Sequence, residues 1–142
     1  MCSSDLMFRK YVLPYLRRMT EAVHAEGGYL VKHTDGNIMR LLPDMIDTGI
    51  DGIQSIDPCA GMDLGAVKKL YGSRITLWGN IDCGRLMSNG TEEDVRRAVR
   101  TCMEKAKAGG GYAICSSNSI LSSTKPENYR AMLDEAYRLA AY

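Results

Sequence analysis

Four groups of polar residues stand out in this chain because each follows directly after a short apolar segment. The groups are His33-Thr34-Asp35-Gly36-Asn37, Asp57-Pro58-Cys59-Ala60-Gly61-Met62-Asp63, Gly79-Asn80-Ile81-Asp82-Cys83 and Ser116-Ser117-Asn118-Ser119. They contain imidazole, carboxylate, amide, hydroxyl and thiol groups, which transfer protons, hold metals or bind polar substrates. The opposite ends of the apolar segments carry plainer glycine turns. This asymmetry predicts a functional site at one end of a sheet.

His33 and Asp35 are the first candidates for catalysis. Residues two apart in an extended segment point to the same side, so both side chains would enter one pocket. A histidine beside a carboxylate binds a metal ion or acts as an oriented proton carrier. The structural alternative is that Asp35 caps the next helix while His33 packs against its start. The residue types leave both interpretations open.

Three further polar residues have the same two kinds of interpretation. Asp57 either places a carboxylate in the pocket or forms a turn with the proline that follows it. Asn80 and Asp82 are again two apart, so one of them is expected to face the pocket while the other braces the loop.

The thiols and the serine-rich segment complete the candidates. Cys83 is a candidate ligand for a soft metal, whereas three cysteines are interpreted as small buried residues: Cys59, Cys102 and Cys115. Ser117 and Asn118 belong to a segment that can hydrogen-bond a carboxylate or phosphate. Trp78 is interpreted as an interior anchor of its strand, or as the floor of the pocket.

Four repeated strand–helix units are expected to position these groups. The predicted strands are 29–33, 51–56, 75–78 and 112–115, since short apolar runs bounded by glycine are typical of buried parallel strands. The predicted helices are 6–25, 38–47, 64–71, 91–108 and 127–141. Pro14 is expected to kink or divide the first helix, and Thr91 can cap the fourth.

Strict alternation of strands and helices implies a parallel sheet with right-handed crossovers. Such a sheet is either an open doubly wound sheet or an arc of a closed barrel. The 142 residues are too few for a complete eight-stranded barrel, which needs about 250. Both architectures bind ligands at the carboxyl ends of their strands. No linker divides the chain, so residues 1–142 are expected to form a single domain.

The composition excludes several classes of partner. A net charge of +1 gives no clustered positive excess for nucleic acid or an anionic membrane. No apolar run approaches the roughly 20 residues that span a bilayer, and the polar N-terminus is unlike a secretory signal. Five cysteines without CxxC spacing are typical of reduced thiols. These features together predict a cytoplasmic protein, and the polar site at the strand ends predicts a small-molecule substrate.

An ordered series of short motifs runs through nearly the whole chain. The motifs are Lys32-His33-Thr34-Asp35-Gly36-Asn37, Gly49-Ile50-Asp51-Gly52, 63–68, Tyr71-Gly72, Leu77-Trp78-Gly79-Asn80-Ile81-Asp82, 90–95, Gly109-Gly110-Gly111-Tyr112 and Pro126-Glu127-Asn128. In this order they resemble the uroporphyrinogen decarboxylase superfamily of (β/α)8 barrels, which includes cobamide-dependent methyltransferases that pass methyl groups to thiols. The resemblance implies an α/β fold whose four βα units form the C-terminal half of a TIM-type (β/α)8 barrel. Residues 1–142 would then be a single partial domain, with the N-terminal half of the barrel absent.

The resemblance also implies roles for individual residues. The decarboxylase handles its substrate's carboxylates and pyrrole nitrogens with an Arg and an Asp from the absent half. The methyltransferase branch holds zinc with a His-x-Cys pair and a later Cys. Here His33 matches the first ligand, Asp35 stands at the first Cys, and Asn118 stands near the second. Aspartate can ligate zinc and asparagine is a poor replacement for thiolate, which leaves Cys83 or Cys115 as the substitute.

Three functions follow as hypotheses. The first is part of a corrinoid-dependent methyltransferase, with zinc, a corrinoid methyl donor and a corrinoid protein as partner. The second is a cofactor-independent decarboxylase of tetrapyrrole carboxylates, and the third is a non-catalytic half-barrel that binds a corrinoid or tetrapyrrole. A homodimer or the missing N-terminal half is expected to cover the two open sheet edges.

The expected catalytic residues are His33, Asp35 and Asp82. The expected substrate-binding residues are Asp57, Asn80, Ser117 and Asn118. The expected metal ligands are His33, Asp35 and Cys83.

Overall fold

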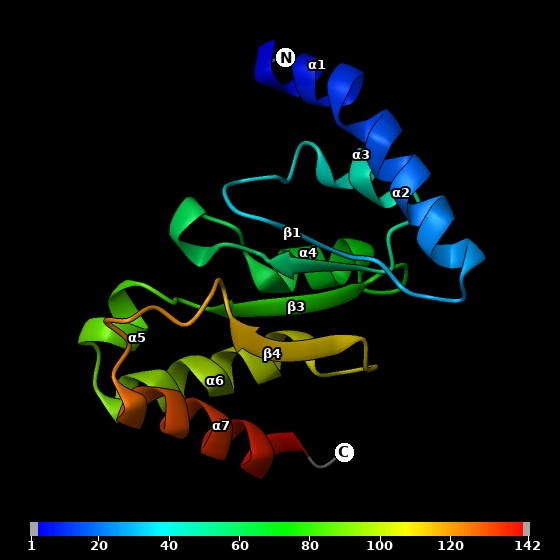
Figure 1. The fold of residues 1–142 in the computed structure, drawn as a ribbon. Helices are drawn as coiled ribbons and strands as arrows, with labels where there is room; N and C mark the ends of the chain where they lie inside the picture. The colour runs from blue at the N-terminus through cyan, green and yellow to red at the C-terminus, as the bar shows by residue number, and fades with distance from the viewer. Residues whose placement is uncertain (1–2, 141–142) are drawn as a thin grey trace.

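The computed structural model describes residues 3–140 and contains one parallel sheet with its connecting helices (Figure 1). The strands are β1 (Val31–Thr34), β2 (Gly52–Ser55), β3 (Thr76–Ile81) and β4 (Tyr112–Ser116). They lie in the order β1-β2-β3-β4, and each neighbouring pair is parallel. The four predicted strands are confirmed, although β1 begins later than predicted and β3 continues to Ile81.

The consecutive strand order decides between the two architectures. A doubly wound sheet reverses its strand order at a switch point, which places helices on both faces. Here every right-handed crossover advances in the same direction, so the connecting helices collect on one face, as in a barrel. The structure is therefore an arc of four βα units, a partial TIM-type barrel. Within residues 3–140, β1 and β4 each have a neighbouring strand on one side only.

The helices follow the predicted pattern in order and approximate position, with a 3-10 helix in addition to it. They are α1 (Ser3–Tyr11), α2 (Leu13–Ala25), α3 (Leu42–Ile46), α4 (Leu64–Tyr71), α5 (Arg85–Asn89), α6 (Glu92–Ala106) and α7 (Pro126–Ala140), with a 3-10 helix η1 (Pro58–Ala60). The helix α3 is shorter than predicted, and α5 was not predicted. None of the helices within residues 3–140 is long and apolar enough to cross a membrane.

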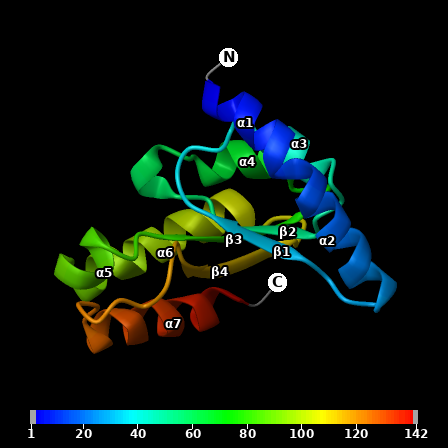
Figure 2. The same ribbon diagram turned by 45° about the horizontal axis from the view of Figure 1, so that its top comes forward.

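Two helix starts show how the sequence sets the boundaries. Pro14 lies in the first turn of α2, where its missing N–H removes no helical hydrogen bond, so the predicted first helix is divided rather than kinked. Thr91 caps α6 as predicted: its hydroxyl accepts from the Asp94 N–H, and the Asp94 carboxylate accepts from the Thr91 N–H. Figures 1 and 2 show α2 on the β1 side of the sheet and α7 on the β4 side, with α1 continuing from α2 away from the sheet.

The two faces of the sheet have different surroundings. Ile53 and Leu77 occupy one cross-strand row and are fully buried in the hydrophobic core. The next row contains His33, Gln54 and Trp78, which therefore point to the opposite face. Trp78 is 39% exposed there, so it does not anchor the core within residues 3–140, and its place on the face of the His33 row leaves the floor of the pocket as the prediction. In a closed barrel this second face would line the interior.

Candidate functional site

The carboxyl ends of the strands lie at the left of Figure 1. A connected set of polar side chains is found at this end of the sheet. His33 Nδ1 contacts Gln54 Oε1, and His33 Nε2 lies 3.5 Å from Asp35 Oδ2. Asp35 accepts hydrogen bonds from Ser55 Oγ at 3.0 Å and from Asn118 Nδ2 at 2.9 Å. We call these five residues the His33 network. It joins β1, β2 and the segment after β4, so distant parts of the sequence meet at one point.

The hydrogen bonds of the Gln54 side chain show that the sheet is curved, with the network on its concave side. Its Nε2 donates to the carbonyl oxygens of Ser116 at 3.1 Å and Ser117 at 3.4 Å, at the end of β4. The strand β3 lies between β2 and β4, and two strand spacings measure about 10 Å in a flat sheet. A glutamine side chain spans that interval only where the sheet is concave. The His33 network therefore lies on the inner side of the arc.

The backbone at the end of β2 is strained where it meets the network. Ser55 and Ile56 have φ angles of 99° and 48°, left-handed values that cost non-glycine residues about 1–3 kcal/mol each. Two contacts hold this turn: the Ser55 hydroxyl donates to Asp35, and Asn80 Nδ2 donates to the Ile56 carbonyl at 2.9 Å. Strain of this kind is concentrated at functional sites. Its local effect is to aim the Ser55 hydroxyl at Asp35.

The two central side chains are accessible to a ligand. The side chains of His33 and Asp35 are 48% and 51% exposed. Asp35 does not cap the following helix; its oxygens accept from Ser55 and Asn118 instead. An accessible imidazole facing a fixed carboxylate is an arrangement that transfers protons to and from a bound molecule.

The side chains of Asp57 and Asn80 hydrogen-bond to other parts of the chain and not to members of the His33 network. The Asp57 carboxylate accepts from the backbone N–H groups of Cys59 at 2.9 Å and Gly36 at 3.2 Å, which caps η1 and ties it to the loop after β1. The side-chain oxygen of Asn80 accepts from the Cys102 thiol at 3.3 Å. Both residues shape the loops around the His33 network rather than joining it.

Asp82, Cys83 and Ser117 form a neighbouring group. Asp82 Oδ1 accepts from two backbone N–H groups of the turn that starts α5, and Ser117 Oγ accepts from the Cys83 N–H at 3.3 Å. Asp82 lines an open cavity of about 460 Å³ together with Cys59. Partial burial, then the Asp82 charge, raises the pKa of the Cys59 thiol. Cys59 is nevertheless exposed, so its prediction as a buried residue is wrong, whereas Cys102 is buried as predicted.

The arrangement does not fit a zinc centre. Structural and catalytic zinc sites need three or four protein ligands, and no three His, Cys, Asp or Glu side chains of residues 3–140 converge in a way that could hold a metal. Both Asp35 oxygens already accept hydrogen bonds, and Asn118 presents its NH₂ group to them. Cys83 lies with Ser117, outside the His33 network. We therefore derive no step through a metal.

Two members of the network, Gln54 and Ser55, were not predicted as site residues. The available signal was a pair of polar residues inside an otherwise apolar strand, Ile53-Gln54-Ser55-Ile56. Polar side chains in a buried strand must find hydrogen-bond partners, so they mark a polar network as readily as the residues after the strand do.

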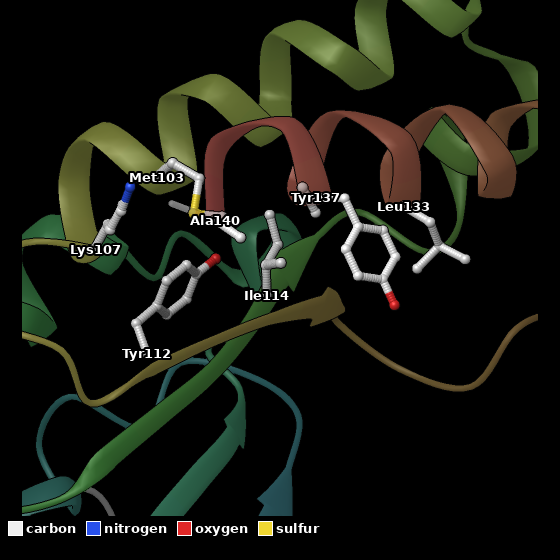
Figure 3. Close-up of a pocket in the computed structure, with 8 residues that line it drawn as sticks. Met103, Lys107, Tyr112, Ile114, Leu133, Tyr137 and Ala140 are labelled. Atoms are coloured by element: carbon white, nitrogen blue, oxygen red, sulfur yellow. The ribbon is translucent and has the colours of Figure 1, made fainter. Parts of the chain in front are cut away.

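A separate cavity lies between the sheet and its last two helices (Figure 3). It measures about 340 Å³ and is lined mainly by apolar parts of β4, α6 and α7, including Tyr112, Ile114 and Tyr137. The Tyr112 hydroxyl donates to the Gly79 carbonyl, and burial raises the pKa of this phenol. The cavity contains no member of the His33 network, so it is a distinct feature.

Comparison with known proteins identifies the family. A family model described as Uroporphyrinogen decarboxylase (URO-D) matches residues 2–139. The chain belongs to the uroporphyrinogen decarboxylase family. A uroporphyrinogen decarboxylase of Dichelobacter nodosus is 25% identical over 133 residues, which cover 94% of this chain and 36% of the relative. A methylcobamide:CoM methyltransferase of Methanosarcina barkeri is 28% identical over 142 residues, covering 95% of this chain and 39% of the relative.

A solved structure confirms the partial barrel. A methyltransferase from Methanosarcina mazei superposes with a TM-score of 0.82 at 23% identity, over 97% of this chain and 38% of the other. The chain thus spans little more than a third of the length of the relatives that it matches. The relatives therefore include both decarboxylases and methyltransferases.

Proposed function

We propose that this chain supplies the proton-accepting part of a methyl-transfer site, with a methylated corrinoid as the methyl donor. The observation that carries the proposal is the accessible His33, whose Nε2 faces Asp35 Oδ2 at 3.5 Å. Three relatives are named as methyltransferases that act with methylcobamide or methylated thiols and coenzyme M. These names support methyl transfer as the reaction class.

The chemistry needs a base. When a methyl group passes to an acceptor X–H, the X–C bond forms, the donor keeps the electron pair of the broken bond, and X–H loses its proton. His33 Nε2 accepts that proton. Asp35 stabilises the resulting imidazolium through its charge, while Ser55 and Asn118 hold the carboxylate in place.

A complete barrel needs more strands than this chain provides. The outer edges of β1 and β4 have no partner strand within residues 3–140, and open edges of a parallel sheet favour pairing. We propose that a second copy, or a polypeptide equivalent to the remaining part of the longer relatives, completes the enclosure. Light scattering after gel filtration distinguishes the two, because a folded dimer is expected only if the chain pairs with itself.

The test of methyl transfer uses the whole 142-residue chain in the assembly that it forms. Methylcobalamin is supplied with coenzyme M as the thiol acceptor, and loss of the methylcobalamin absorbance is followed. His33→Ala is expected to lower the rate at least about 100-fold, the usual contribution of a general base. His24→Ala is the matched control, because His24 pairs with Asp51 away from the network. Equal rates for wild type and His33→Ala, with unchanged circular dichroism, would contradict the proposal.

Decarboxylation of a tetrapyrrole carboxylate is the second candidate. It is favoured by the same His33–Asp35 pair, since decarboxylation replaces CO₂ by a proton and needs no metal ligand. Release of CO₂ from uroporphyrinogen without methyl transfer would select this candidate. Metal analysis after purification without chelators adds a separate check: one equivalent of zinc that is lost in His33→Ala would overturn both proton-transfer mechanisms.

A further inference from the structure

We propose that Gln54 is a positioning residue that holds neutral His33 with its proton on Nδ1, so that Nε2 is the nitrogen available to accept a proton. The role of Nε2 rests on the proposed function. The position of the proton does not, because it follows from the hydrogen bonds that surround Gln54.

The orientation of the Gln54 amide is fixed by β4. Its NH₂ group lies 3.1 Å from the Ser116 carbonyl oxygen and 3.4 Å from the Ser117 carbonyl oxygen. Both oxygens can only accept hydrogen bonds. Reversing the amide would place its own oxygen against these two carbonyl oxygens and lose the hydrogen bond to Ser116 together with the longer contact to Ser117. The NH₂ group therefore faces β4, and Oε1 faces β1.

The proton position on His33 follows from that orientation. Gln54 Oε1 contacts His33 Nδ1 and is an acceptor, so Nδ1 must be the donor. In a neutral imidazole the other nitrogen then carries the lone pair, and the hydrogen bond made by one ring nitrogen decides the role of the other.

Asp35 is the competing partner, and its geometry is weaker. A carboxylate beside Nε2 would favour a proton on that nitrogen. The Nε2–Oδ2 distance of 3.5 Å is longer than the normal range for an N–H···O bond, and the same oxygen already accepts from Asn118 at 2.9 Å. Nδ1 is hydrogen-bonded to Gln54 Oε1, whereas Nε2 lies outside the normal range from Asp35, so the contact with Gln54 decides the proton position. The Nε2–Asp35 pair can then take up a proton from a bound acceptor.

Gln54 is well placed to hold this arrangement. It lies within β2, between paired strands, and its side chain is partly buried and bonded to β4. Side chains fixed by a strand and by second contacts orient a reactive group more reliably than loop residues do.

The test is a long-range ¹H–¹⁵N correlation of the histidine rings at a pH where they are neutral. The chain has only two histidines, His24 and His33, so His24→Ala assigns the signals. Wild type is expected to show the Nδ1–H tautomer at His33. Gln54→Met removes the acceptor at similar size, leaves Asp35 as the remaining partner, and is expected to move the proton to Nε2. Gln54→Glu is the control that keeps an acceptor for Nδ1 while it loses the donor to β4.

Each outcome decides a separate claim. An Nε2–H tautomer in wild type, or an unchanged Nδ1–H tautomer in Gln54→Met with normal circular dichroism, would overturn the assignment of Gln54. If the tautomer behaves as expected but His33→Ala transfers methyl groups normally, the proposed function alone fails. If both hold, Gln54→Met is expected to lower kcat by about 10- to 100-fold, the range found when a partner that orients a metal-bound histidine is lost, with KM little changed and partial rescue by Gln54→Glu.

Discussion

Asp35→Asn removes the charge of the His33 network while preserving its shape. The asparagine oxygen can accept from Asn118, and its NH₂ group can donate to the Ser55 hydroxyl, which rotates to accept. The hydrogen bonds at 2.9 Å and 3.0 Å therefore have replacements of the same geometry. The change isolates the electrostatic contribution of Asp35 to the proton accepted by His33.

The expected loss of rate follows from the distance between His33 and Asp35 and from their exposure to solvent. Two unit charges 3.5 Å apart interact by about 5 kcal/mol at an effective dielectric constant of 20 and by about 1 kcal/mol at that of water. Both side chains are about half exposed, which favours the lower part of that range. A loss of about 1–2 kcal/mol in stabilisation of the imidazolium corresponds to a 5- to 30-fold fall in the rate of methyl transfer.

The assay compares initial rates at low salt and at about 1 M salt, where the Debye length of about 3 Å screens exposed pairs. The ratio of the wild-type rate to the Asp35→Asn rate should be smaller at high salt than at low salt. Asp47→Asn is the matched control, because this carboxylate pairs with Arg74 at 2.7 Å and does not belong to the network. An unchanged rate in Asp35→Asn would refute the electrostatic role. A loss beyond about 1000-fold would show that Asp35 bonds directly to a reacting group.

Two further predictions concern the helices that support the sheet. A hydrogen bond from Arg138 lowers the pKa of Glu135 from 4.5 to about 2; desolvation opposes this shift and Arg100 adds to it. Between these two pH values the folded chain therefore binds fewer protons than the unfolded chain. The resulting stability is present above about pH 4.5 and is lost as the pH falls towards 2. Urea unfolding measured from pH 6 to 2 should therefore show a falling free energy of unfolding. If Glu135→Gln loses free energy of unfolding with pH as steeply as wild type does, Glu135 is not the cause. Thr91→Ala should lower the free energy of unfolding by about 1 kcal/mol, because it removes one half of the α6 capping box; an unchanged urea midpoint would show that the cap contributes nothing.

Much of the fold could be predicted because its signals are local. Short apolar runs bounded by glycine marked all four strands, and Thr91 marked the start of α6. The helix α5 was missed because five residues give no apolar period to recognise. It is started by Asp82, whose carboxylate accepts from two backbone N–H groups, and the same pattern of residues is equally compatible with a plain turn.

The candidate site could be predicted only in part, because most of its contacts are long-range. His33 and Asp35 were found from their spacing after one strand. The bond from Asn118 to Asp35 joins residues 83 positions apart, and no spacing rule predicts such a pair. Asp57 was ambiguous as a candidate, since a carboxylate before a turn can face a pocket or the backbone. The direction of the neighbouring N–H groups, visible only in the structure, shows that it binds the backbone.

A substrate is expected to bind at the His33 network, and not in the cavity beside α7. Amide and side-chain resonances of the ¹⁵N-labelled chain, recorded during titration with coenzyme M, test this most directly. Binding at the network should progressively shift the signals of Gly36, Gln54 and Asn118 and leave those of Tyr112 and Tyr137 unmoved. Shifts confined to Tyr112 and Tyr137, with none around His33, would contradict it.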